Sequence, residues 1–153
     1  MPRIVDSIVI LAPAETVWRV LADPTYIPRL YRDALTVEMN PPGPVSVGQR
    51  YKVLNRVGDL RTEVFVVITR VEKEKVLSSR GTPGGLFETF RHTVVLTPNA
   101  WETKVDITFE YTFSSSYTAK IPDVATAERT AGTNLRGYAQ NLKDLSELLP
   151  LPS

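Results

Sequence analysis

Cysteine is absent from this chain of 153 residues, and histidine occurs once. Without cysteine there are no disulfides, no thiolate metal ligands and no cysteine nucleophile. A single histidine would leave a zinc ion to carboxylates alone, so we predict no metal site. The sequence gives no indication of a bound cofactor either, and a reducing cytoplasm is the simplest location to expect.

Long apolar runs and concentrated charge are also missing. No apolar run approaches about 18 residues and the N-terminus lacks a signal-peptide pattern, so we expect no integral membrane segment. The net charge is +1 and no run of Lys or Arg exceeds two residues, which argues against a nucleic-acid surface. Apolar content of 42% and charged content of 23% are ordinary for a globular chain. The length favours one domain over residues 1–153, and the oligomeric state stays open.

The strongest pattern is a predicted helix over residues 123–149. Its apolar residues recur at steps of three and four and form one stripe: Val124, Ala127, Ala131, Leu135, Tyr138, Leu142, Leu145 and Leu149. At about 1.5 Å per residue the helix would be about 39 Å long, so a large apolar surface must cover it. The middle of the chain offers only strands for this purpose.

The two halves of the stripe differ in side-chain size. Leucines fill the C-terminal half, whereas the N-terminal half carries Ala127 and Ala131 with Asn134 at the edge. From the helix alone, close approach of a sheet and an internal cavity are equally consistent with these small residues.

The rest of the chain predicts strands with two short helices near the start. Residues 3–11 are rich in Ile and Val, a helix carries Val17 and Leu21, and Asp23 caps a brief second helix. Six strands follow, at 35–39, 49–57, 60–71, 76–80, 87–96 and 101–113, with Gly58 and Asp59 as a tight turn. The last strand alternates cleanly between apolar and polar residues, and the short connections favour an antiparallel sheet with one wet face. We therefore predict an α+β fold of about seven antiparallel strands and one long C-terminal helix.

Several segments resemble the START-related superfamily, also called SRPBCC. Residues 12–23 (APAETVWRVLAD) are similar to the family's opening, and residues 26–30 (YIPRL) continue it, although many relatives have Trp where Leu30 stands. Residues 47–51 (VGQRY) and 142–145 (LKDL) resemble the usual start of the third strand and close of the final helix. The resemblance implies a helix-grip fold, as in polyketide cyclases, lipid-transfer domains and birch-pollen-allergen proteins. It also implies an apolar cavity between sheet and helix, with its mouth near the helix N-terminus, where loops 41–44 and 81–85 gather.

His92 is the first candidate for chemistry. If Phe90, Val94 and Leu96 face inward, period-two alternation brings His92 and Glu88 inward too. His92 would then be a polar anchor or proton carrier in the cavity, or a hydrogen-bonded side chain in its wall. If the register slips by one residue, Arg91 enters and His92 leaves.

The predicted ligand-binding residues combine apolar walls with a few polar groups. They are Tyr51, Val53, Phe90, His92, Phe109, Tyr111, Ala127, Ala131, Asn134 and Leu135. Trp18 and Trp101 are interpreted as packing residues, and residues 114–116 as an exposed strand end. No nucleophile motif is present, so no catalytic residue is assigned.

Three functions remain as hypotheses. The first is binding or transport of an apolar or aromatic small molecule, such as a lipid, polyketide or quinone, in the cavity. The second is a polyketide cyclase or dehydratase that uses His92, Tyr111, Tyr51 and Asn134. The third is a ligand-free interaction domain, for which the proline-rich residues 41–44 are the one hint.

Overall fold

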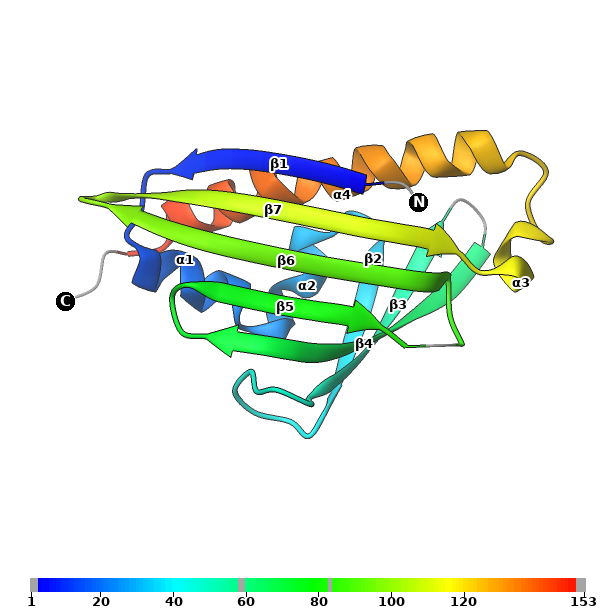
Figure 1. Ribbon diagram of the computed structural model, residues 1–153, viewed down its shortest axis with the longest axis horizontal. Coiled ribbons are helices and arrows are strands. Elements are labelled where there is room, and N and C mark those ends of the chain that lie inside the picture. Colours follow the sequence, from blue (N-terminus) through cyan, green and yellow to red (C-terminus); the bar gives the residue numbers. More distant parts are fainter. Residues whose placement is uncertain (1–2, 58–59, 83, 151–153) are drawn as a thin grey trace.

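The computed structural model describes residues 3–57, 60–82 and 84–150. These residues form a curved antiparallel sheet of seven strands in the order β1-β7-β6-β5-β4-β3-β2, with a long helix packed beside it (Figure 1). The strands are β1 (Arg3–Ile10), β2 (Ala34–Asn40), β3 (Arg50–Val57), β4 (Leu60–Glu72), β5 (Val76–Gly81), β6 (Phe87–Asn99) and β7 (Glu102–Phe113). The helices are α1 (Ala14–Leu21), η1 (Pro24–Tyr26), α2 (Ile27–Leu30), α3 (Ser115–Thr118) and α4 (Val124–Leu148). This is the helix-grip arrangement expected from the sequence. The predicted turn at Gly58 and Asp59 lies outside the described residues.

Helix α4 begins and ends where the sequence places it. The carboxylate of Asp123 caps the first turn by accepting hydrogen bonds from the Thr126 backbone N–H at 3.2 Å and its hydroxyl at 2.6 Å. At the other end Leu149 leaves the helical conformation directly before Pro150, because the residue before a proline avoids the α region. Asp23 caps η1 in the same manner, accepting from the backbone N–H of Thr25.

Side chains of α4 fasten the helix to the edge strand β1. The Lys143 ammonium donates to the Val9 carbonyl at 3.0 Å, and the Glu147 carboxylate accepts from the Leu11 backbone N–H at 2.8 Å. Lys143 and Glu147 also form an ion pair with each other. Backbone groups at the end of this edge strand are therefore already engaged by the helix.

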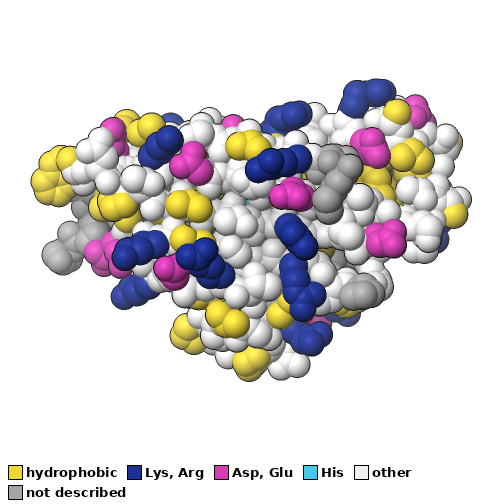
Figure 2. All heavy atoms as spheres, in the orientation of Figure 1, with side chains coloured by type: hydrophobic (Ala, Val, Ile, Leu, Met, Phe, Trp, Pro, Cys, Tyr) yellow, Lys and Arg dark blue, Asp and Glu magenta, His cyan; other side chains and the backbone are white. Residues whose placement is uncertain are grey.

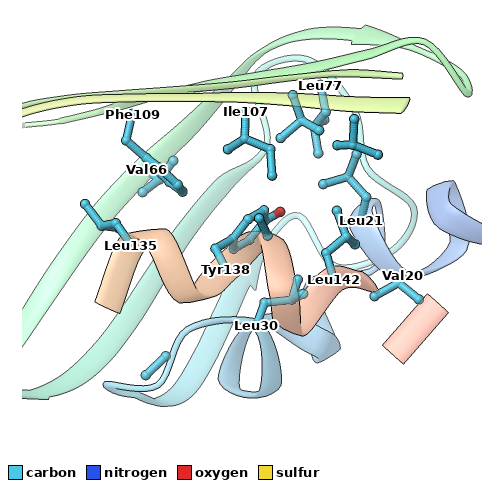
Figure 3. Close-up of a cluster of buried hydrophobic side chains, with 14 of the residues drawn as sticks. Val20, Leu21, Leu30, Val66, Leu77, Ile107, Phe109, Leu135, Tyr138 and Leu142 are labelled. Carbon is cyan, nitrogen blue, oxygen red and sulfur yellow. The ribbon is translucent and has the colours of Figure 1, made fainter. Parts of the chain in front are cut away.

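The solid core lies under the C-terminal half of α4. Figure 3 shows Tyr138 and Leu142 projecting from the helix toward Phe109 and Ile107 of β7, with Leu30 of α2 below them. Every α4 residue that is buried lies at or after Gly132: Gly132, Leu135, Tyr138, Ala139, Leu142 and Ser146. The first two turns of the helix contribute no buried residue, so the helix packs unevenly along its length.

The outer face of the sheet is mostly polar, as the alternation in β7 predicts, although Val5, Val9 and Val95 are exposed on it. Val105, Ile107, Phe109 and Tyr111 are buried, while Lys104 on the opposite face is exposed. Figure 2 shows acidic and basic side chains spread over this outer face and no histidine on it.

Two interpretations of the sequence are wrong at the ends of β7. Trp101 does not pack: its side chain lies at the tight turn between β6 and β7 and is 83% exposed. Residues 114–116 are not a strand end: Ser114 caps the short helix α3 (Ser115–Thr118), because its hydroxyl accepts from the Tyr117 backbone N–H. Trp18, by contrast, is buried as expected.

Candidate functional site

A cavity separates the sheet from the N-terminal half of α4. It offers about 130 Å³ to the centres of water-sized molecules. That is about ten times the ~10–15 Å³ that admits a single water, so the space is far larger than a packing defect. Ala127 and Ala131 form part of its helix side, and Val53, Val64 and Val66 of β3 and β4 form part of its floor. The small helix residues therefore border open space.

The lining indicates which loops lie near the cavity. It includes Leu86 and Phe87, just after the loop at 81–85, and Tyr117 of α3. The loop at 41–44 does not line the cavity, contrary to expectation. Carbonyls of Pro41 and Gly43 instead accept hydrogen bonds from the Gln49 side chain.

The structure brings eight of the ten predicted ligand-binding residues to the cavity wall. They are Tyr51, Val53, Phe90, His92, Ala127, Ala131, Asn134 and Leu135. Phe109 and Tyr111 have the expected inward orientation but are not part of the lining. Phe109 lies stacked on the His92 ring, with centroids 4.3 Å apart, and the Tyr111 hydroxyl donates to the Glu128 carbonyl at 3.4 Å. Their role in binding a ligand stays a prediction.

His92 faces inward because β6 has the register that places Phe90, Val94 and Leu96 in the core. Arg91 accordingly points outward and is exposed. Glu88 is exposed, contrary to the simple alternation. The cause is a break in the β6–β7 register between Phe87 and Thr89, which turns Phe87 inward in place of Glu88.

Tyr31, which the sequence analysis did not identify, is the polar partner of His92. It is the residue at which α2 ends, and its hydroxyl lies 3.4 Å from His92 Nδ1. Its ring also contacts the Tyr138 ring, with centroids 4.9 Å apart. The sequence pattern does not predict the orientation of Tyr31, because this residue lies between a helix of four residues and a strand and belongs to no periodic segment.

Burial keeps both members of this pair uncharged. Burial lowers the pKa of His92 to about 3, since the imidazolium would lose its hydration without gaining an anionic neighbour. Burial also raises the pKa of Tyr31 well above its usual value, and the neighbouring Tyr138 adds to this effect. At neutral pH the pair is therefore a neutral imidazole beside a neutral phenol.

A second polar group lines the cavity where α4 approaches the start of β2. The Asn134 side-chain amide donates a short hydrogen bond to the Asp33 carboxylate. Burial raises the pKa of Asp33, and the Asn134 hydrogen bond and the charge of Arg32 oppose this rise. The sequence analysis identified Asn134 but not Asp33, which lies between α2 and β2 where no pattern indicates orientation.

Tyr51 is held by the side chain of Gln49, which directly precedes β3. Its hydroxyl donates to Gln49 Oε1 at 3.1 Å, so this group is already satisfied without a ligand. Burial, and to a smaller extent the charge of Asp23, raises the pKa of Tyr51 to about 12. Tyr51 therefore contributes a neutral wall to the cavity.

Two further findings concern the described part of the chain as a whole. Within it, no three His, Asp or Glu side chains lie close enough together to hold a metal ion. None of its helices is sufficiently long and apolar to cross a membrane.

Comparison with solved structures shows the same fold in several proteins. The chain superposes on a protein from Thermus thermophilus with a TM-score of 0.75 and 16% identity, covering 95% of this chain and 97% of the other. It superposes on the Zhui aromatase/cyclase from a Streptomyces species with a TM-score of 0.74 and 14% identity, covering 95% and 90%. A START superfamily protein from Mycobacterium smegmatis gives 0.75 and 12%, covering 97% and 99%.

Sequence comparison identifies the family. A search of curated proteins finds no match. Residues 1–147 match the model of the family described as polyketide cyclase / dehydrase and lipid transport. With a helix-grip fold that encloses an apolar cavity, this chain belongs to the polyketide cyclase / dehydrase and lipid transport family.

Proposed function

We propose that this protein binds and carries an apolar or aromatic small molecule in the cavity between the sheet and α4. The observation that carries the proposal is the cavity itself, which is walled mainly by aliphatic and aromatic side chains with a few polar groups. Such a lining favours ligands through burial of apolar surface, at about 25 cal/mol per Å² before ordering costs, while the polar groups fix orientation. The family to which the chain belongs supports the same class of ligand.

Filling the cavity from its helix side is expected to block binding. In Ala131→Leu the longer side chain occupies the space beside Ala127, so we expect the affinity for an aromatic probe such as 1-naphthol to fall at least about tenfold. The free energy of unfolding should change by less than about 1 kcal/mol, because the side chain enters open space instead of displacing packed atoms. Calorimetric titration and urea unfolding measure the two effects.

Ala125→Leu provides the matched control, because Ala125 is exposed on the same helix. It should leave the affinity for 1-naphthol unchanged. Severe destabilisation by Ala131→Leu would indicate that this region is solidly packed. Unaltered binding by Ala131→Leu, or no binding of any aromatic or lipid probe by the original protein, would exclude the proposed function.

The Asp33–Asn134 pair supports a second candidate function, a cyclase or dehydratase. A carboxylate with a raised pKa at a cavity wall is a suitable general base for removing a proton from carbon between two carbonyl groups. His92 is a weaker candidate base, because a pKa of about 3 is far from neutral. The test is cyclisation of a synthetic oligoketone: loss of product with Asp33→Asn, at unchanged affinity for the substrate, would favour catalysis over carriage.

A further inference from the structure

The two ring nitrogens of His92 differ in their hydrogen bonding. In the described part of the chain, the Tyr31 hydroxyl is the hydrogen-bonding partner of the imidazole, and it lies 3.4 Å from His92 Nδ1. Its Nε2 is buried and has no hydrogen-bond partner among the residues that the structure describes. The tautomer of a histidine is normally set by the hydrogen bond of its second nitrogen. Here nothing at the second nitrogen fixes which nitrogen carries the proton.

We propose that the cavity selects an uncharged ligand and holds a ligand hydroxyl or carbonyl oxygen at the Tyr31 hydroxyl, with the tautomer of His92 setting whether that hydroxyl accepts or donates. This inference rests on the proposed function, and it narrows the ligand from any apolar molecule to a neutral, oxygen-bearing one.

The Tyr31–His92 pair has two hydrogen-bonding arrangements, which differ in the nitrogen of His92 that carries the proton. When Nε2 carries the proton, the Tyr31 O–H donates to Nδ1 and the phenol oxygen accepts from a ligand hydroxyl. When Nδ1 carries the proton, Nδ1–H donates to the phenol oxygen and the Tyr31 O–H donates to a ligand carbonyl. The Tyr31 hydroxyl can therefore form a hydrogen bond with a ketone and also with the corresponding alcohol or phenol, although most hydrogen-bonding sites discriminate between these groups.

The surroundings of the pair exclude a ligand charge. Aromatic rings enclose His92: Phe109 is stacked on it at 4.3 Å, and Tyr138 meets it edge to face at 5.0 Å. The charged residues that line the cavity are Arg32 and Asp33, which are adjacent in the chain and oppose each other's field. A ligand carboxylate beside Tyr31 would be buried without an unopposed cation to balance it, because the charge of Arg32 already acts on Asp33, and such burial is strongly unfavourable.

Four naphthalene-sized probes test the proposal by calorimetric titration at pH 7. They are naphthalene, 1-naphthol, 1-tetralone and 1-naphthoate. We expect 1-naphthol and 1-tetralone to bind within about threefold of each other and about three- to tenfold more tightly than naphthalene, as one net hydrogen bond provides. We expect 1-naphthoate to bind more weakly than naphthalene. In Tyr31→Phe the advantage of both oxygenated probes over naphthalene should vanish, whereas Tyr26→Phe, a tyrosine outside the lining, should keep it.

A second readout needs no substitution, because the chain contains one histidine. In protein labelled with ¹⁵N-histidine, the two imidazole nitrogens give one pair of signals whose shifts report the tautomer. We expect Nδ1 to carry the proton with 1-tetralone bound and Nε2 with 1-naphthol bound. The same tautomer with both probes would overturn the role of His92, even if Tyr31→Phe does not fold.

The outcomes also separate this inference from the function on which it rests. If none of the four probes binds, the proposed function fails. If all four bind alike, or if Tyr31→Phe weakens naphthalene as much as 1-naphthol, the inference fails while the proposed function stands.

Discussion

Lowering the pH from 6.5 to 4.5 is expected to reduce the free energy of unfolding by about 2 kcal/mol through His92 alone. In the native state burial holds the pKa of His92 at about 3, whereas the ordinary value is 6.5. As the pH falls through 6.5, the unfolded chain therefore binds a proton that the folded chain does not. The contribution of His92 to the free energy of unfolding is thus fully retained well above pH 6.5 and is lost as the pH falls toward 3. The slope is about 1.4 kcal/mol per pH unit within that window.

Urea unfolding at half-unit pH intervals measures this slope, and His92→Phe provides the control because phenylalanine does not titrate. The contributions of other titrating groups differ from that of His92 in their pH range or in the direction of their effect on stability. The pKa values of Asp123 and Glu147 are lowered from ordinary values of 3.8 and 4.5, so their contribution is lost mainly at pH values below those. Asp33 acts in the opposite sense, since its native pKa is raised. An equal slope in the original protein and in His92→Phe would contradict the assignment.

Truncating Leu142 to alanine is expected to cost about 2–5 kcal/mol of the free energy of unfolding. Leu142 is fully buried under the solid half of α4, where side chains from α1, α2 and β7 surround it (Figure 3). Its removal therefore loses both the burial of the side chain and the contacts around the cavity that it leaves.

The matched control is Leu148→Ala on the same helix. Leu148 is 79% exposed, so the same chemical change should alter stability by less than about 0.5 kcal/mol. Chemical unfolding of the two variants and the original protein provides the comparison. Similar losses in both variants would mean that intrinsic helix propensity, and not packing, determines the effect.

The elements were predictable where the pattern has a strong period. The alternation from Val105 to Tyr111 gave β7 its two faces, and the stripe ending at Leu149 gave α4 its length, because burial on one side imposes those periods. Asp23 and Asp123 marked helix starts through their capping carboxylates. Glu88 and residues 114–116 were misplaced because a bulge and a four-residue helix are set by local register and capping, which no period reveals.

The site was predictable for residues that lie on long elements and not for residues between them. His92 and Ala131 follow from alternation in β6 and from the stripe of α4. Tyr31 and Asp33 lie between a short helix and a strand, and their orientation depends on how that segment meets the sheet. Phe109 lies on the predicted inward face of β7, but its ring is stacked on His92 and does not reach the cavity. Alternation predicts the face on which a residue lies but not its distance from the cavity.

The uneven packing of α4 has a consequence for access to the cavity. Its first two turns contribute no buried residue, while the turns after Gly132 are anchored in the core and fastened to β1. Lifting the loosely held turns would uncover the interior without separating any pair of strands. Opening of the cavity and global unfolding would then be governed by different ends of one helix, so that the interior can become accessible while the protein remains folded.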